Sequence, residues 1–92
     1  MIRSFRDKHT ESIFRQRRVR VFERIAQVAL RKLVQIDSAD ELRDLASPPA
    51  NRLEALQGDR AGQYSVRIDD RYRVCFRWKE GHAFDVEITD YH

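Results

Sequence analysis

The stretch from residue 64 to residue 89 reads YSVRIDDRYRVCFRWKEGHAFDVEIT and decides the fold. Apolar side chains recur there at every second position, which is the pattern of β-strands with one buried face. The alternating runs cover residues 64–68, 72–78 and 84–88. Polar turn sequences separate them at Asp69-Asp70-Arg71 and Glu80-Gly81-His82. The pattern therefore predicts an antiparallel meander.

Upstream of this meander the apolar period is helical. Between Val19 and Ile36, apolar residues recur at spacings of three and four, while arginines occupy the other faces. The spacing predicts an amphipathic basic helix over this range. Before it, Thr10 is the expected cap of a brief helix that runs through Arg15, and Ile2 to Phe5 are expected to form a short edge strand.

The segment between the predicted helices and strands contains one motif that starts a helix and one that ends it. Ser38-Ala39-Asp40-Glu41 has the S-x-x-E form of a capping box, which predicts a second short helix to about Leu45. Pro48-Pro49 cannot continue a helix, so Ser47 to Asn51 should be a loop, followed by a short strand around Leu53 to Leu56. We expect an α+β fold in one domain, residues 1–92. Two or three N-terminal helices should pack on one face of a small, curved, mainly antiparallel sheet.

Composition limits the setting in which this chain works. Its 92 residues are 41% hydrophobic, enough for one modest core. The single Cys75 excludes an intrachain disulfide and fits a reducing compartment. No apolar run approaches the roughly 20 residues of a membrane span, and the first residues lack an apolar signal-peptide core. A cytoplasmic location with no membrane partner is the expectation.

The charge is unevenly distributed along the chain. The net charge is +3, but residues 1–36 carry ten Lys and Arg against three acids. Fifteen of the eighteen cations are arginines, whose planar guanidinium pairs with phosphate bidentately and stacks on bases. The high arginine content favours an RNA partner. Charge alone supports a solvated basic helix, or a docking site for an acidic protein, about equally well.

If the apolar stripes face the helices, the alternate positions form an open polar face. A ladder of cross-strand charge pairs is the simpler interpretation of this face, and patterning alone favours it over catalysis. The predicted open-face residues are Arg67, Arg73, Arg77, Asp85, Glu87, Thr89 and Tyr91.

The same face also holds groups that RNA cleavage requires. A base must take the proton of the ribose 2′-hydroxyl, donors must stabilise the phosphorane, and an acid must protonate the leaving oxygen. Glu54 is the candidate base, His92 the candidate acid and Arg73 the phosphate clamp, because Arg73 projects from a central strand. Arg52 and Arg60 can guide the RNA strand from loop edges, and Tyr91 can stack on a base or donate a hydrogen bond.

Other motifs are weaker. His9 and His82 show no metal-binding spacing, and Cys75 has no His at a diagnostic spacing, so a structural thiol is expected. The turn from Gly58 to Gly62 lacks the Lys-Ser/Thr of a phosphate-binding loop. We expect no metal and no cofactor.

The turn from Gly58 to Gly62, together with the end of the chain, resembles the HigB branch of the RelE/ParE toxin superfamily. The sequence looks like the HigB/GraT-type members of that branch. The combination of a Gly-Asp-Arg-x-Gly turn with a terminal Asp-Tyr-His is specific, and the resemblance spans nearly the whole chain. The matching stretches are residues 2–5, 41–45, 47–49, 51–56, 58–63 and 86–92.

The resemblance implies a microbial-ribonuclease-like fold and a toxin that cleaves messenger RNA in the ribosomal A site without a metal. It implies neutralisation by a HigA-type antitoxin with a helix-turn-helix domain, so that DNA is contacted only through that partner. Carried over by matching position, the implied active-site residues are Arg73, Asp90, Tyr91 and His92. Alternatives that remain open are a gyrase-inhibiting ParE-like toxin and a non-enzymatic RNA- or protein-binding module.

This chain departs from one form of the family pattern. Some HigB toxins have His and Lys in the strand before the Gly-Asp-Arg turn, where this chain has Glu54 and Gln57. Losing a cation there should weaken phosphate binding, which predicts a slow or strongly ribosome-dependent nuclease. The strand alternation also directs Asp90 away from the open face unless the chain bends. The expected RNA-contacting residues are Arg52, Gln57, Arg60, Arg67 and Arg77.

Overall fold

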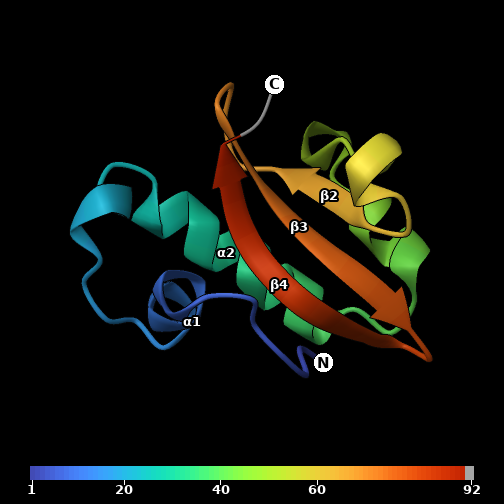
Figure 1. The fold of residues 1–92 in the computed structure, drawn as a ribbon, viewed down its shortest axis with the longest axis horizontal. Helices are drawn as coiled ribbons and strands as arrows, with labels where there is room; N and C mark the ends of the chain where they lie inside the picture. Colours follow the sequence, from blue (N-terminus) through green and yellow to red (C-terminus); the bar gives the residue numbers. More distant parts are fainter. Residues whose placement is uncertain (91–92) are drawn as a thin grey trace.

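The computed structural model describes residues 1–90, and Tyr91 and His92 lie outside the described residues. Two α-helices are followed by a four-stranded sheet (Figure 1). The elements are α1 (Lys8–Phe14), α2 (Ala26–Ser38), β1 (Glu54–Ala55), β2 (Tyr64–Arg67), β3 (Tyr72–Lys79) and β4 (His82–Asp90). Short 3₁₀ helices lie at Arg20–Phe22, Leu42–Ala46, Pro49–Asn51 and Gly58–Arg60. This α+β order confirms the fold class predicted from the sequence.

The sheet is an antiparallel meander with the order β1-β2-β3-β4. The N-terminal segment runs alongside β4 in the parallel direction, through single bridges from Ile2 to Ala83 and from Phe5 to Val86. Figure 1 shows this segment beside β4 at the edge of the sheet. The expected edge strand is thus two isolated bridges, which cover the free edge of β4.

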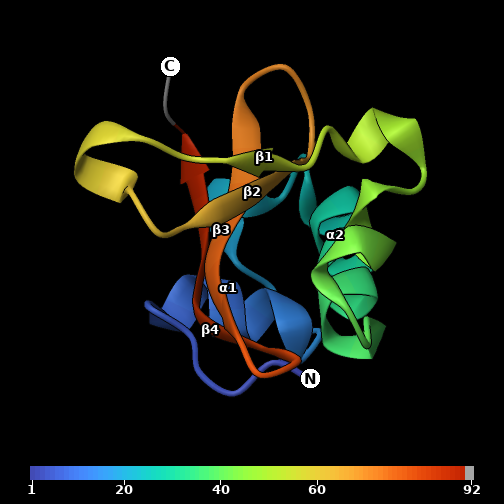
Figure 2. The same cartoon turned by 90° about the vertical axis from the view of Figure 1, so that its right-hand side faces the viewer.

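Both α-helices lie on one side of the sheet. Figure 2 shows the strands edge-on, with α2 on one side and the 58–60 turn on the other. The core between the layers contains Leu33 and Ile36 from α2 with Val74, Phe76 and Val86 from the sheet, all fully buried. No helix of the described residues is both long and apolar enough to cross a membrane.

An irregularity in β4 changes which side chains face the helices. The register shifts between Cys75 and Arg77, and Asp85 has a positive φ of 53°. The extra residue of such a bulge reverses the alternation beyond it. Ala83 is therefore fully buried, while Phe84 pairs with Arg77 on the open face. The prediction that Phe84 belongs to the buried stripe was wrong.

The start of α1 also differs from the prediction. Asp7 caps the helix, and its Oδ1 accepts a hydrogen bond of 2.7 Å from the Thr10 backbone nitrogen. Thr10 is fully buried inside the helix, where its Oγ1 accepts a 2.9 Å hydrogen bond from Ile88 N of β4. Thr10 thus joins α1 to the sheet, a long-range role that a local capping pattern does not reveal.

The long basic helix is shorter than its apolar period indicated. α2 begins at Ala26, and the preceding residues form an extended turn around the 3₁₀ helix Arg20–Phe22. The arginines of this segment lie three and four residues apart, as at Arg17, Arg20 and Arg24, and like charges at that spacing oppose a helix. β-Branched valines between them weaken it further.

The predicted capping box lies one turn too early. Ser38 is the last residue of α2, and its hydroxyl donates to Val34 O at 2.8 Å. The reciprocal cap is made instead by Glu41 and Asp44, where Asp44 Oδ2 accepts from Glu41 N at 2.9 Å. The short helix that follows, Leu42–Ala46, is a 3₁₀ helix at the predicted place.

Candidate functional site

Arg73 lies near the middle of the open face. Its Nε donates to Ser65 Oγ and its Nη2 donates to the backbone carbonyl of Arg52, both at 2.7 Å. The Glu54 carboxylate lies 3.7 Å from Nη2, and 15% of the Arg73 side chain is exposed. Nη1 has no partner within residues 1–90. The guanidinium is therefore fixed in orientation with a donor still available, as stabilisation of a phosphate requires.

The carbonyl that holds Arg73 belongs to a strained loop. Arg52 has a left-handed backbone with φ of 46°. The preceding Asn51 is fully buried, and its amide donates to Gln35 Oε1 at 3.0 Å and to Leu45 O at 3.1 Å. Its Oδ1 accepts a 2.6 Å hydrogen bond from Lys32 Nζ. These contacts hold the loop against α2, and so they fix the Arg52 carbonyl that accepts the hydrogen bond from Arg73 Nη2.

Lys32 is the only buried Lys or Arg within residues 1–90. Only 6% of the residue is exposed, and burial is the main cause that lowers the pKa of its ammonium group. Asn51 supplies a neutral acceptor rather than a counter-charge. Because a buried polar group without a partner is costly, each of these two residues keeps the other in place.

Arg60 forms a second fixed cation on the open face. Its Nη1 donates to Glu87 Oε1 at 2.8 Å and to Gln63 Oε1 at 3.1 Å, and its Nη2 donates to Thr89 Oγ1 at 3.2 Å. The Glu87 side chain is 13% exposed and also lies 3.7 Å from Arg6. A hollow of about 310 Å³ beside this cluster is lined by Arg6, Asp59, Arg60 and Gln63.

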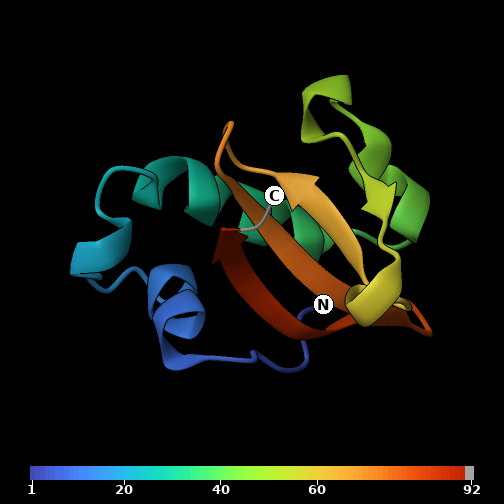
Figure 3. The same ribbon diagram turned by 45° about the horizontal axis from the view of Figure 1, so that its top comes forward.

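The strands between these two arginines carry Cys75. Cys75 pairs in register with Ser65 of β2 and with Glu87 of β4. Figure 3 shows β3 between these two strands. Cys75 is fully buried, and burial raises the pKa of its thiol to about 11. A thiol that stays protonated at neutral pH is a poor nucleophile, which supports the structural role expected from the sequence.

Asp90 is the last described residue of β4. It pairs with Tyr72, so it lies in register with the helix-facing stripe, as the alternation predicted. Its Oδ2 accepts a 2.7 Å hydrogen bond from Arg71 Nε. Asp90 therefore contacts the β2–β3 turn, away from Arg73. The predicted roles of Tyr91 and His92 concern residues outside the described part of the chain.

Comparison with known proteins identifies the family. The model of the RelE-like toxin of the type II toxin-antitoxin system HigB matches residues 3–92. The chain belongs to this HigB-like toxin family. Toxin HigB-1 of Vibrio cholerae is 37% identical over 90 residues, covering 96% of this chain and 95% of the relative. Endoribonuclease HigB of Proteus vulgaris is 33% identical over 61 residues, covering 66% of this chain and 65% of the relative.

Solved structures agree on the fold. The toxin-antitoxin complex YoeB-YefM from Staphylococcus aureus includes a chain that superposes with a TM-score of 0.57. The alignment covers 100% of this chain and 98% of that chain at 16% identity. The family model and the relative from Vibrio cholerae confirm the family resemblance predicted from the Gly-Asp-Arg turn and the chain end.

The remaining predicted RNA-contacting residues of this HigB-like chain are spread along the open face. Arg67 is the register partner of Arg73, but its guanidinium pairs with Asp70. Arg77 lies farther along β3, 3.8 Å from Asp85. Gln57 is exposed, and its carbonyl accepts from Arg60 N at 3.3 Å. The structure brings Arg52, Glu54 and Arg73 together, whereas Arg77 lies apart from them.

A close approach explains one glycine of the family turn. Gly62 has φ of 91°, a conformation that side chains rarely adopt. A Cβ built on Gly62 would lie 2.9 Å from Arg77 Nη1. The turn therefore packs directly on the β3 arginine.

Four residues that shape this site were not predicted from the sequence. Asn51 and Lys32 come from segments read as loop and helix surface, and Ser65 from a strand position with no charge. Arg6 follows the N-terminal segment and reaches Glu87 only because that segment pairs with β4. Asn51 is a single buried polar residue in a loop, so no helical or strand periodicity of apolar residues indicates its burial. Within residues 1–90 no group of three or more His, Cys, Asp or Glu is placed to hold a metal.

Proposed function

We propose that this chain is the endoribonuclease toxin of a type II toxin-antitoxin system, and that it cleaves messenger RNA in the ribosomal A site. The observation that carries this proposal is the fixed guanidinium of Arg73, beside the Glu54 carboxylate on an open sheet face. Membership in the HigB-like toxin family supports it, and so does the relative named Endoribonuclease HigB.

The chemistry starts from the 2′-hydroxyl of the RNA itself. Its oxygen attacks the adjacent phosphate, and Glu54 accepts the proton as general base. Arg73 donates to the equatorial oxygens of the phosphorane, where negative charge accumulates. His92 protonates the leaving 5′-oxygen, while Tyr91 stacks on a base. Asp90 acts by position, since its contact with Arg71 anchors the end of β4 next to these two residues.

RNA binding in this proposal depends on cations at the edges of the open face. Arg52 and Arg60 flank Arg73 and guide the backbone, with Arg67 and Arg77 farther along the strands. Gln57 replaces a cation that some relatives carry, so phosphate binding is weaker. The ribosome then supplies the missing positioning of the messenger RNA, and the isolated toxin cleaves free RNA slowly.

The partners of the toxin follow from the same proposal. A HigA-type antitoxin with a helix-turn-helix domain neutralises it and carries any contact with DNA. Its substrate is messenger RNA bound to the ribosome, so the toxin acts in the cytoplasm. Co-purification of the toxin with the product of the neighbouring gene tests the first of these partners.

The experiment is induced expression of the wild-type chain and of the variants Arg73→Ala and His92→Ala, with messenger RNA ends mapped against ribosome positions. We expect growth arrest with cleavage in the A site for wild type, and relief of both by either variant. Circular dichroism of the purified variants must show an intact fold. Arrest with DNA-damage signalling and no cleavage would instead establish the gyrase-inhibiting alternative.

A further inference from the structure

A second charged region lies on the helical side of the molecule. It is formed by the turn between α1 and α2, which contains Arg17, Arg18, Arg20 and Arg24, all exposed. Arg18 pairs with Glu23 at 2.8 Å. The other three arginines have no carboxylate partner within residues 1–90. We call this region the arginine surface.

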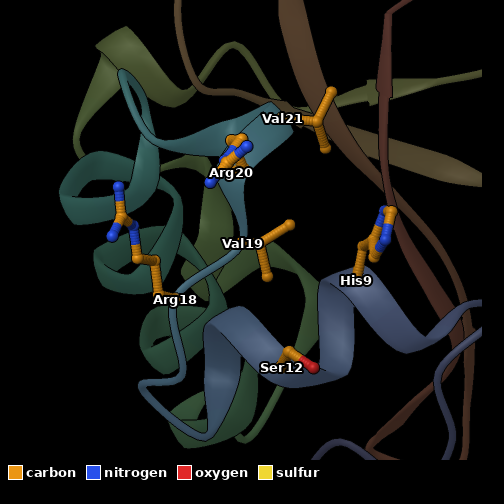
Figure 4. A pocket seen from close by; sticks show the side chains of 6 residues that line it. All are labelled: His9, Ser12, Arg18, Val19, Arg20 and Val21. Atoms are coloured by element: carbon orange, nitrogen blue, oxygen red, sulfur yellow. The ribbon is translucent and has the colours of Figure 1, made fainter.

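The arginine surface is hollowed. A hollow of about 530 Å³ lies between α1 and the turn, and Figure 4 shows Val19 and Val21 turned toward the side on which His9 lies. A second hollow of about 280 Å³ shares Arg18 with the first. A third of about 380 Å³ shares Val21 and extends to Arg71 on the β2–β3 turn. Each neighbouring pair of hollows thus shares one lining residue, and we call the three hollows together the depression.

The turn that carries this surface is firmly anchored. Phe22 packs edge-on against Tyr72, with ring centroids 5.7 Å apart, and against His9 at 6.1 Å. Val19 and Ile25 are buried in the core on either side of Phe22. The surface is therefore formed before any partner arrives, and little chain entropy is lost when it binds.

Apolar groups among the arginines decide what kind of partner fits. Val21 is 62% exposed, although the rest of its segment is anchored in the core. A phosphate backbone would use the arginines and leave Val21 without a contact. An amphipathic peptide uses both, since carboxylates can pair with Arg20 and Arg24 while an aliphatic side chain covers Val21.

We propose that the arginine surface binds an acidic, amphipathic segment of a partner protein. Carboxylates of that segment pair with Arg17, Arg20 and Arg24, and one of its aliphatic side chains enters the hollow between Val19 and Val21. The depression lies on the helical side, whereas Arg73 faces the opposite side of the sheet, so this segment binds without covering Arg73. The inference does not depend on nuclease activity.

The test uses a short fluorescent peptide in which Glu-Glu and Leu-Leu pairs alternate. This peptide is titrated with the full chain. A peptide with Ser in place of Leu and a single-stranded RNA serve as comparison probes. The binding variants are Arg20→Glu with Arg24→Glu, and Val21→Ser. Arg31→Glu is the matched control, because Arg31 is exposed on α2 and lines none of the three hollows.

We expect the Glu-Leu peptide to bind more tightly than the Glu-Ser peptide. The double charge reversal should weaken it at least about tenfold, two reversed ion pairs being worth together about 1.4 kcal/mol. Val21→Ser should weaken the Glu-Leu peptide but not the Glu-Ser peptide, and Arg31→Glu should change neither. Equal losses for Arg31→Glu and the double reversal would overturn the proposal. So would RNA binding that the double reversal abolishes while the peptide does not bind.

Discussion

The two arginine-rich regions of the molecule differ in how their guanidinium groups are held. On the open face, Arg73 and Arg60 are mostly buried and each is fixed by two or more hydrogen bonds. On the arginine surface, Arg17, Arg20 and Arg24 are exposed, and they make no ion pair within residues 1–90. Fixed donors suit a transition state, because no energy is spent on orienting them during the reaction. Free arginines suit binding, where they adapt to a partner.

The largest effect should come from Arg73→Lys. Lysine keeps the charge, but its ammonium group cannot donate both to Ser65 Oγ and to a phosphate in the fixed geometry of the guanidinium. We expect cleavage of ribosome-bound messenger RNA to fall about 100- to 1000-fold. Single-turnover cleavage measures this, with thermal unfolding as the control for the fold. Full activity of the lysine variant would show that charge alone suffices.

The reactivity of Cys75 tests whether this part of β3 is closed to reagents in solution. Burial raises the pKa of its thiol to about 11, so the thiolate is scarce at neutral pH and increases as the pH rises toward 11. Against an unfolded thiol of pKa about 8.5, alkylation at pH 8 should be slower by about 100-fold or more. Mass spectrometry after iodoacetamide treatment, with and without denaturant, measures the ratio. Rapid labelling of the folded chain would contradict the burial of Cys75.

Asn51→Ala should loosen Arg73 without touching it. Loss of the buried amide should cost about 1–3 kcal/mol of stability and reduce cleavage about tenfold. If Asn51 acts through the Arg52 carbonyl, the reduction should disappear in an Arg73→Ala background, which a double-mutant cycle measures. Ile13→Val, in the core of α1, is the control for lost stability alone. Additive losses in the cycle would mean that Asn51 is merely structural.

The smallest effect should come from the free arginines. Arg24→Gln removes a cation that makes no ion pair within the described residues, so the free energy of unfolding should change by less than about 0.5 kcal/mol. Cleavage should also be unchanged. Urea unfolding and the cleavage assay check both. A large loss of stability would remove the distinction between the fixed and the free arginines.

The fold was predictable where side chains alternate without interruption. The runs around Val66, Val74 and Ile88 give the three long strands in their observed order. The alternation failed at Phe84, because the bulge at Asp85 is set by backbone geometry that no apolar period records. The start of α2 was missed for a related reason, since an apolar spacing of three and four also fits the turn around the 3₁₀ helix Arg20–Phe22, in which Val19 and Ile25 are buried.

The candidate site was predictable in part. Arg73 follows from its place on a central strand, Arg52 and Arg60 from loop edges, and Glu54 from the short strand predicted around Leu53 to Leu56. The hydrogen bonds that orient these groups are contacts between distant segments, such as that of Lys32 with Asn51. A single sequence carries no period for such contacts. Which residues hold the arginines is therefore information that the three-dimensional structure adds.

The pairing of the N-terminal segment with β4 has a consequence for synthesis of the toxin. The bridges from Ile2 to Ala83 and from Phe5 to Val86, with the hydrogen bond from Ile88 N to Thr10 Oγ1, join residues 2–10 to β4, which lies more than 70 residues later in the sequence. These contacts cannot form while β4 is still inside the ribosomal exit tunnel. The nascent chain therefore completes this part of its fold only after β4 has left the ribosome, and the contacts of residues 2–10 with β4 are among the last to form.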